Sequence, residues 1–201
     1  VGQEDDARVL LLTTGNQNSY RGFFRLLSEQ HIPFSASGHL KALDNPARRF
    51  DLVIAPSGAA PELERYVRAG GRLLIAGATA PPPALAVGKV LGVRAAAQGA
   101  WRIHDHTRLP SLADTHLLFL DGPYVEFEPP ANARPLLTFI PPAMFGPPEK
   151  VWGDKVETTI PGLVFADHGA GRIACIPWDV GGLYYRHGSQ AHAGLMADVI
   201  D

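Results

Sequence analysis

The pattern of hydrophobic and polar residues is most informative between residues 51 and 79, where it predicts a strand, a helix and a second strand. Residues 52–55 form a short apolar run without polar interruption, which is typical of a strand buried on both faces. Residues 62–68 then place apolar side chains at helical spacing, and the glycines at 70–71 end that helix. A second apolar run, 73–76, follows at once. Strand, helix and strand joined by short links predict a right-handed parallel unit of an α/β sheet.

The N-terminal part of the chain predicts two more strands and a helix. Residues 9–12 form a first buried strand, and residues 13–19 form the polar loop that follows it. Ser19 is a suitable N-cap for a helix that carries the apolar positions 23–27. Residues 32–35 predict a weaker strand. Because the crossovers are short, we expect 9–12, 52–55 and 73–76 to be adjacent inner strands of one parallel sheet.

Beyond residue 79 the pattern changes. Three prolines at 81–83 form a stiff connection, and residues 85–91 predict a short helix ended by Gly92. From residue 98 to residue 148 the apolar period becomes two, and prolines bound the apolar runs. This segment therefore predicts a peripheral insertion of short antiparallel strands.

The last third returns to regular structure. Residues 163–166 and 172–176 predict the two strands of a hairpin, because the glycines within 167–171 favour a tight turn. Residues 178–187 predict a loop rich in aromatic and basic side chains, and residues 190–200 predict a closing helix.

Composition limits the possible classes of protein. The 201 residues are 46% hydrophobic and 19% charged, which is enough to bury the core of a single α/β domain spanning residues 1–201. The formal net charge of −2 and a pI near 6.5 give no general attraction to nucleic acid or to anionic membranes. No apolar stretch approaches the roughly 20 residues that a membrane-spanning helix needs.

Cys175 is the only cysteine, which excludes an internal disulfide and a multi-cysteine zinc site. It lies in the apolar run of residues 173–176, so we expect an inert buried thiol. The sequence begins at Val1 without a methionine, which is the pattern of a fragment of a longer chain or of a mature form without its leader. We expect a cytoplasmic location, with secretion as the alternative if a leader was removed.

Several short motifs together resemble the class I glutamine-amidotransferase-like fold, a flavodoxin-like three-layer architecture. Within that fold, the chain is similar to the β-galactosidase trimerisation-type domain that is appended to catalytic barrels in certain glycoside hydrolases. The resemblance covers about residues 8–200. It rests on P-S-G at 56–58, Y-V-x-x-G-G at 66–71, R-L-L-I-A-G at 72–77, G-x-G-R-I-A-C-I-P-W-D at 169–179 and L-Y-Y-R at 183–186.

The resemblance implies where a catalytic nucleophile would lie. Working amidotransferases carry a G-x-C-x-G turn after the strand that corresponds to residues 73–76, and a histidine in an H-x-E triplet near the C-terminus. Here the turn carries Ala78, which cannot act as a nucleophile, and the sequence contains no H-x-E triplet. Thr79 has no evident base beside it. We therefore predict no catalytic residues in this domain.

Two other groups have the residue types of a catalytic or metal site. His104 and His106 share one face of a strand and His116 lies close in sequence, a cluster that zinc accepts, although solvated histidines on a polar edge strand explain the same pattern. Glu126 and Glu128 also share one face, but catalytic carboxylates of glycosidases come from different elements. We expect no metal and no cofactor.

The segment 178–187 is the best binding candidate. Trp178, Tyr184 and Tyr185 have flat apolar faces suited to stacking on a sugar ring, and the polar Asp179, Arg186 and His187 can bind hydroxyl groups. The same six residues are also typical of a protein interface, or of internal packing.

Two classes of function follow. The first is a non-catalytic accessory or assembly domain of a carbohydrate-active enzyme, whose partners are a catalytic barrel of the same polypeptide, further copies of itself, or carbohydrate. The second is a free-standing hydrolase that uses His104, His106 and Glu126. The length of the parent reading frame distinguishes the two.

Overall fold

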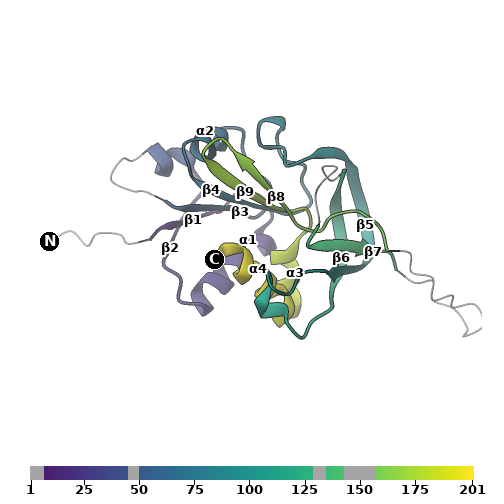
Figure 1. Cartoon of the computed structure of the whole chain (residues 1–201). Coiled ribbons are helices and arrows are strands. Elements are labelled where there is room, and N and C mark those ends of the chain that lie inside the picture. Colours follow the sequence, from purple (N-terminus) through teal and green to yellow (C-terminus); the bar gives the residue numbers. More distant parts are fainter. Residues whose placement is uncertain (1–6, 45–49, 129–134, 143–156) are drawn as a thin grey trace, which may run out of the picture.

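Two β-sheets organise the computed structural model, which describes residues 7–44, 50–128, 135–142 and 157–201 (Figure 1). The larger sheet has six strands in the order β2-β1-β3-β4-β9-β8. All neighbours are parallel except β8, which is antiparallel to β9. The strands are β1 Val9–Leu12, β2 Phe34–Ser37, β3 Leu52–Ala55, β4 Arg72–Ala76, β8 Val164–His168 and β9 Gly171–Ile176.

The order of the inner strands confirms the expectation from the sequence. Val9 of β1 is in register with Leu52 of β3, which is in register with Arg72 of β4. The side chains of β1 and β3 are buried throughout, as their uninterrupted apolar runs predict. The protein therefore has an α/β fold of the flavodoxin-like kind, with a central parallel sheet. The weaker second strand begins two residues later than predicted, at Phe34.

Helices cover both faces of this sheet (Figure 1). One face carries α1 Gln17–Glu29, α3 Val180–His187 and α4 Gln190–Ile200, and the other carries the 3-10 helix η1 Leu40–Asp44 with α2 Leu63–Arg68. The predicted helices after residue 61 and from residue 190 are thus confirmed. Cys175 points into the core beneath the second face and is 2% exposed, as expected. None of the helices in the described ranges is long and apolar enough to cross a membrane.

The smaller sheet is formed by the insertion and is antiparallel, in the order β6-β5-β7. Its strands are β5 Lys89–Ile103, β6 Leu117–Glu128 and β7 Leu137–Ile140, with the 3-10 turn η3 Pro110–Leu112 between β5 and β6. The prediction of a helix over residues 85–91 is wrong. Only the 3-10 turn η2 Pro83–Leu85 forms, because Val90 and Val93 pair with residues of β6 instead. The strands are also longer than predicted, and Pro123 lies inside β6, which is an edge strand and tolerates proline.

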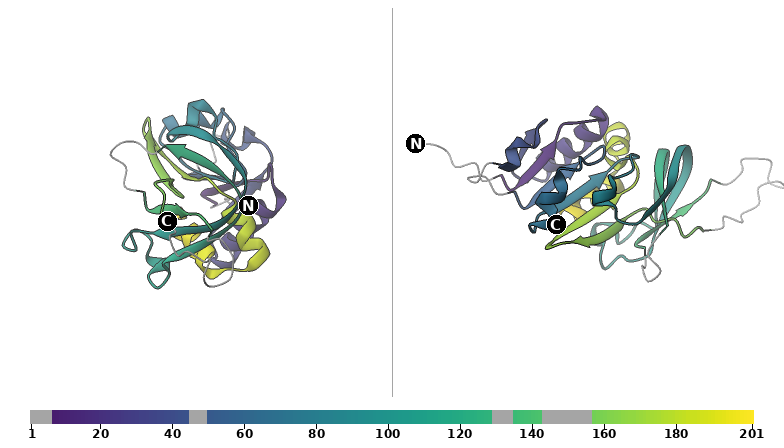
Figure 2. Two further views of the ribbon diagram at one scale, coloured as in Figure 1. Left: turned by 90° about the vertical axis from the view of Figure 1, so that its right-hand side faces the viewer. Right: turned by 90° about the horizontal axis from the view of Figure 1, so that it is seen from above.

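An aromatic cluster joins the two sheets. Trp101 of β5 stacks on Trp178, with ring centroids 5.8 Å apart, and meets Tyr124 edge-on at 5.7 Å. The backbone N–H of Val125 donates to the Pro177 carbonyl over 2.7 Å. Figure 2 shows the smaller sheet beside the larger one rather than stacked over it. The insertion therefore shares the hydrophobic core of the parallel sheet instead of forming a separate one.

Candidate functional site

The carboxyl end of the parallel sheet is where an open α/β fold usually binds its ligand. The turn after β4 contains Gly77 and Ala78, and the resemblance assigns the amidotransferase nucleophile to the position of Ala78. Gly77 has a φ of 105°, and its N–H lies 3.1 Å from the carbonyl oxygens of both Ile176 and Trp178. Ala78, which follows Gly77 in this turn, has only a half-buried methyl group as its side chain. No nucleophilic atom is present at the position where the turn would present one.

The loops at this end are tied to one another by hydrogen bonds. The N–H of Asn16 donates to the Ser57 hydroxyl over 2.7 Å, which joins the loop after β1 to the loop after β3. A Cβ atom on Gly15 would lie 2.3 Å from the Cβ of Ser57, so only glycine permits this approach. The side-chain amide of Asn16 also donates to Asp179 over 3.3 Å. These internal bonds occupy groups that a ligand would otherwise contact.

Asp179 serves as a structural cap. Its carboxylate accepts hydrogen bonds from the Gly182 N–H, over 2.8 Å, and from the hydroxyl of the buried Ser19. It is therefore the N-cap of α3 and also anchors α1. The prediction that Ser19 caps α1 is wrong. Asn16 is the N-cap and accepts from the Asn18 N–H, while Ser19 lies inside the helix and faces α3.

The segment predicted as an aromatic loop is mostly the helix α3. Its two glycines lie at the crossing with α1, where a Cβ on Gly22 would come within 2.0 Å of the Gly181 carbonyl oxygen. Trp178 and Tyr184 are fully buried, so neither offers a face to a partner. The Trp178 indole donates to the Gly162 carbonyl over 2.9 Å. These two residues belong to the core, which corrects their assignment as surface binding groups.

Three of the six candidates remain on the surface: Tyr185, Arg186 and His187, here called the α3 surface. Tyr185 is 40% exposed, and the guanidinium of Arg21 lies 5.6 Å from the centre of its ring. Arg186 donates to the Asp121 carbonyl over 3.4 Å, and the ring of His187 meets Phe119 edge-on at 5.4 Å. The α3 surface is thus a row of aromatic and basic side chains beside β6, the combination enriched at protein interfaces. Its role in binding stays a prediction.

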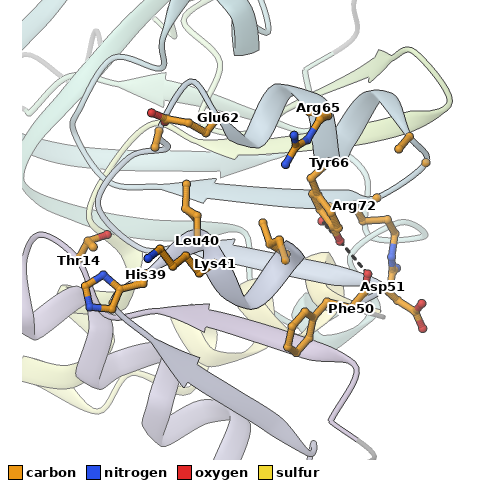
Figure 3. A pocket seen from close by; sticks show the side chains of 16 residues that line it. Thr14, His39, Leu40, Lys41, Phe50, Asp51, Glu62, Arg65, Tyr66 and Arg72 are labelled. Atoms are coloured by element: carbon orange, nitrogen blue, oxygen red, sulfur yellow. Dashed lines mark hydrogen bonds between the residues drawn. The ribbon is translucent and has the colours of Figure 1, made fainter. Parts of the chain in front are cut away.

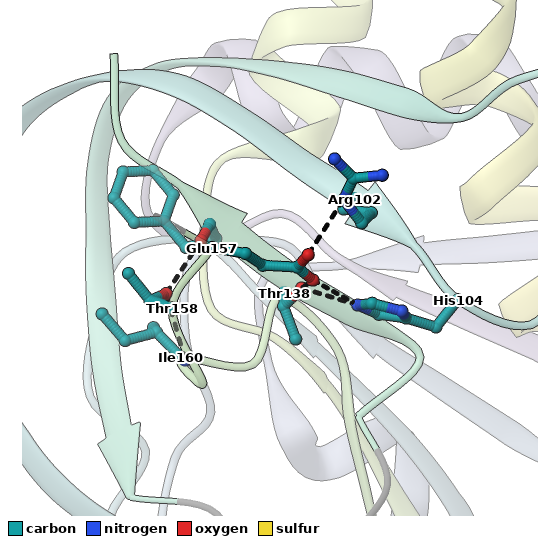
Figure 4. A network of polar contacts seen from close by, with 7 residues as sticks. Arg102, His104, Thr138, Glu157, Thr158 and Ile160 are labelled. Carbon is teal, nitrogen blue, oxygen red and sulfur yellow. Dashed lines mark hydrogen bonds and ion pairs between the residues drawn. The ribbon is translucent and has the colours of Figure 1, made fainter. Parts of the chain in front are cut away.

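The three histidines of the possible zinc cluster do not converge. His104 Nε2 lies 2.7 Å from both Thr138 Oγ1 and a carboxylate oxygen of Glu157 (Figure 4). His106 instead donates through Nδ1 to the Leu112 carbonyl over 2.9 Å, and the His116 ring lies edge-on to it at 5.6 Å. Among the described residues, no group of three or more His, Cys, Asp or Glu side chains is arranged to hold a metal ion.

The two glutamates of β6 form ion pairs across the strands. Glu126 binds Arg94, and Glu128 accepts from the Lys89 ammonium over 2.9 Å. His104, His106 and Glu126, the residues of the hydrolase alternative, therefore each have a different partner. The structure does not assemble them into one site.

A groove of about 1140 Å³ between η1 and α2 was not anticipated from the sequence (Figure 3). Leu40, Phe50 and Tyr66 line it together with basic and acidic side chains. The Tyr66 hydroxyl lies 3.2 Å from the carbonyl oxygens of Phe50 and Arg72, and burial raises its pKa, so the hydroxyl stays protonated. Because the lining comes from segments far apart in the chain, no local motif could have predicted it.

His192 is a further buried polar residue that the sequence analysis missed. Its Nε2 lies 3.0 Å from the Phe119 carbonyl and its Nδ1 lies 2.8 Å from the Ser189 hydroxyl. A carbonyl only accepts, so Nε2 carries the proton. Burial lowers the pKa of His192 to about 4, which keeps the ring neutral at pH 7. Its only sequence signal is its place on the apolar side of α4.

Comparison with known proteins identifies the fold. No protein-family model and no curated protein matches the sequence. Among solved structures, the α-L-fucosidase isoenzyme 2 from Paenibacillus thiaminolyticus is 18% identical, with a TM-score of 0.66 over 96% of this chain and 32% of the fucosidase. A β-galactosidase from Bacillus circulans is 14% identical, with a TM-score of 0.59 over 97% of this chain and 31% of that enzyme. This chain thus spans about a third of the length of these enzymes.

A third similar structure has nearly the same length as this chain. A ThuA-like protein from Bacteroides uniformis is 10% identical and matches with a TM-score of 0.65 over 100% of this chain and 92% of its own. At these identities the likenesses establish the fold and no more. These structural similarities support the expected amidotransferase-like architecture as a fold.

Proposed function

We propose that this chain is a non-catalytic accessory domain of a carbohydrate-active enzyme. The observation that carries the proposal is that the turn after β4 has only the methyl group of Ala78 at the position to which the resemblance assigns a nucleophile. The loops around that turn are bonded to one another through Asn16, Ser57 and Asp179. The likeness to parts of a fucosidase and of a β-galactosidase supports a glycoside hydrolase as the parent enzyme.

The α3 surface is the proposed contact with the partner, either a catalytic barrel of the same polypeptide or a further copy of this domain. Tyr and Arg side chains dominate the binding energy of many interfaces, and here they lie on a helix that is anchored at its first turn by Asp179. A rigid helix presents these side chains with little loss of conformational entropy on binding.

The experiment compares the parent polypeptide with a Tyr185→Ala/Arg186→Ala variant. We expect the variant to show weaker assembly in sedimentation velocity, or lower glycosidase activity, while the unfolding temperature of the domain changes little. Leu91→Ala is the matched control, because Leu91 is 52% exposed but lies on β5, outside the α3 surface. Unchanged assembly and activity in the double variant would contradict the docking role.

A second candidate is a free-standing protein. The match to 92% of the ThuA-like protein favours it, because that protein consists almost entirely of this fold. A parent reading frame of several hundred residues that encodes a barrel supports the accessory domain, and one of about the length of this chain supports the free-standing protein.

A further inference from the structure

We propose that the outward face of the smaller sheet binds an extended, uncharged saccharide chain. This saccharide face consists of Leu117 and Phe119 on β6, Arg102 on β5, and the adjoining His104 and Glu157. Nothing in the proposed docking role of the α3 surface requires this face. The choice of a saccharide over another neutral polar ligand rests on the proposed role in a carbohydrate-active enzyme.

The strand register places the exposed residues of β5 and β6 on one side of the smaller sheet, whereas Thr138 of β7 on the same side is buried. Arg102 lies opposite Leu117 on one side and opposite Thr138 of β7 on the other. Ala100 lies opposite Phe119 in the same way. Residues paired across an antiparallel ladder point to the same side of the sheet. The neighbouring residues Trp101 and Leu118 point to the opposite side and are buried there.

The apolar part of the face is exposed although the sheet has a well-filled core on its other side. Leu117 is 48% exposed and Phe119 is 39% exposed. The ring of Phe119 is held by one edge-on contact with His187, at 5.4 Å, and by one tilted contact with His192, at 4.5 Å. An aromatic ring fixed in this manner offers a flat apolar surface to the C–H face of a sugar ring.

The polar part of the face is organised before any ligand binds. Glu157 accepts from Arg102 Nε over 3.0 Å with one carboxylate oxygen, and from the Thr138 hydroxyl and His104 Nε2 with the other. Figure 4 shows the terminal nitrogens of Arg102 and the second ring nitrogen of His104 pointing away from Glu157. The hydrogen bond from Thr138, with the charges of its neighbours, lowers the pKa of Glu157, so the carboxylate is ionised at neutral pH.

The chemistry of this face selects a neutral ligand with many hydroxyl groups. The charges of Arg102 and Glu157 cancel, so no ion of either sign is favoured. The remaining donors of Arg102 and the acceptors of Glu157 can bind the donor and acceptor functions of sugar hydroxyls. None of these five residues lines the groove of Figure 3, and an open sheet face suits an extended chain better than a small ligand.

The test is native electrophoresis of the chain in gels that contain soluble β-1,4-galactan, galactomannan or xyloglucan, against a gel without polysaccharide. We expect at least one polysaccharide to retard the protein, and Phe119→Ala and Arg102→Met to reduce the retardation at least fivefold. Phe119→Tyr keeps the ring and should keep binding. Phe24→Ala is the matched control, because Phe24 is 45% exposed on α1. Melting curves verify that each variant is folded.

Absence of retardation by all three polysaccharides overturns the proposal, as does equal retardation of Phe119→Ala and Phe24→Ala. If Phe119→Ala instead weakens assembly of the parent polypeptide and no polysaccharide retards the chain, the face is a protein interface. In that case the saccharide proposal fails while the accessory function stands. Loss of the accessory function is detected separately, by the Tyr185→Ala/Arg186→Ala experiment.

Discussion

The carboxylate of Asp179 accepts a hydrogen bond from the hydroxyl of Ser19, although 160 positions separate the two residues. The same carboxylate caps the first turn of α3, so one side chain fixes the start of α3 and its crossing with α1. The residue expected to contact a ligand is thus part of the scaffold that holds the α3 surface in place.

We expect Asp179→Ala to lower the free energy of unfolding by about 2–3 kcal/mol, because the cap is lost and the buried Ser19 hydroxyl loses its acceptor. Urea denaturation measures the change. Asp167→Ala is the control, since its carboxylate is 80% exposed and pairs with Arg172 on the surface, which is worth about 0–1 kcal/mol. Equal losses in the two variants would show that Asp179 has no special role.

The two neighbouring tyrosines should behave differently. Tyr184 is fully buried, binds Glu29 through its hydroxyl and lies 4.9 Å below the guanidinium of Arg25, so Tyr184→Ala should cost about 3 kcal/mol or more. Tyr185→Ala should cost less than about 1 kcal/mol, because the ring is exposed and packs mainly on Arg21. Thermal or urea unfolding of the single variants tests this.

Stability should fall between pH 7 and pH 5 because of His192. Burial lowers the pKa of this side chain to about 4 in the folded chain, against about 6.5 in the unfolded chain. Between the two pKa values the unfolded chain binds a proton on His192 that the folded chain does not bind. The free energy of unfolding should therefore be about 2 kcal/mol lower at pH 5 than at pH 7. Urea denaturation at both pH values measures the effect. The His192→Asn variant should be less stable than the original chain at pH 7, but its stability should decrease less between pH 7 and pH 5. An unchanged decrease would show that other groups cause the loss of stability in acid.

Cys175 should react slowly with thiol reagents in the folded chain. Burial raises the pKa of its thiol to about 12, so the reactive thiolate is scarce, and the sulfur lies under the second face of the sheet. Alkylation followed by mass spectrometry should therefore give a rate that rises with urea in step with unfolding. Rapid labelling without denaturant would contradict the buried position.

The chain should not hydrolyse glutamine. Ala78 removes the nucleophile, and the sequence has no H-x-E triplet to supply a base, so Ala78→Cys should be inactive as well. An assay for released glutamate, with a working amidotransferase as the positive control, tests both proteins. Activity of the Ala78→Cys variant would show that a histidine elsewhere can act as the base.

The helices and strands that the local sequence pattern predicted correctly are those in which the same kind of side chain is buried along the whole element. β3, α2 and β4 follow one another with short links, and an uninterrupted apolar run of four residues between polar segments is typical of a strand with both faces covered. The hairpin of β8 and β9 and the helix α4 are marked by glycines and by apolar spacing. The alanine at the position to which the resemblance assigns a nucleophile was equally visible, because Ala78 lies two residues after the end of β4.

By itself, the sequence determined the parallel core, the antiparallel character of the insertion and the buried thiol. Only the tertiary structure decided that residues 180–187 form a helix, that Trp178 and Tyr184 are internal, and that His104 meets Glu157 instead of His106. The physical reason is the range of the contacts. The glycine pair of α3 is typical of a loop in the sequence, and its place in a helix follows from the close packing of α1 against it. Whether a tyrosine lies on the surface or in the core likewise depends on which distant segment covers it.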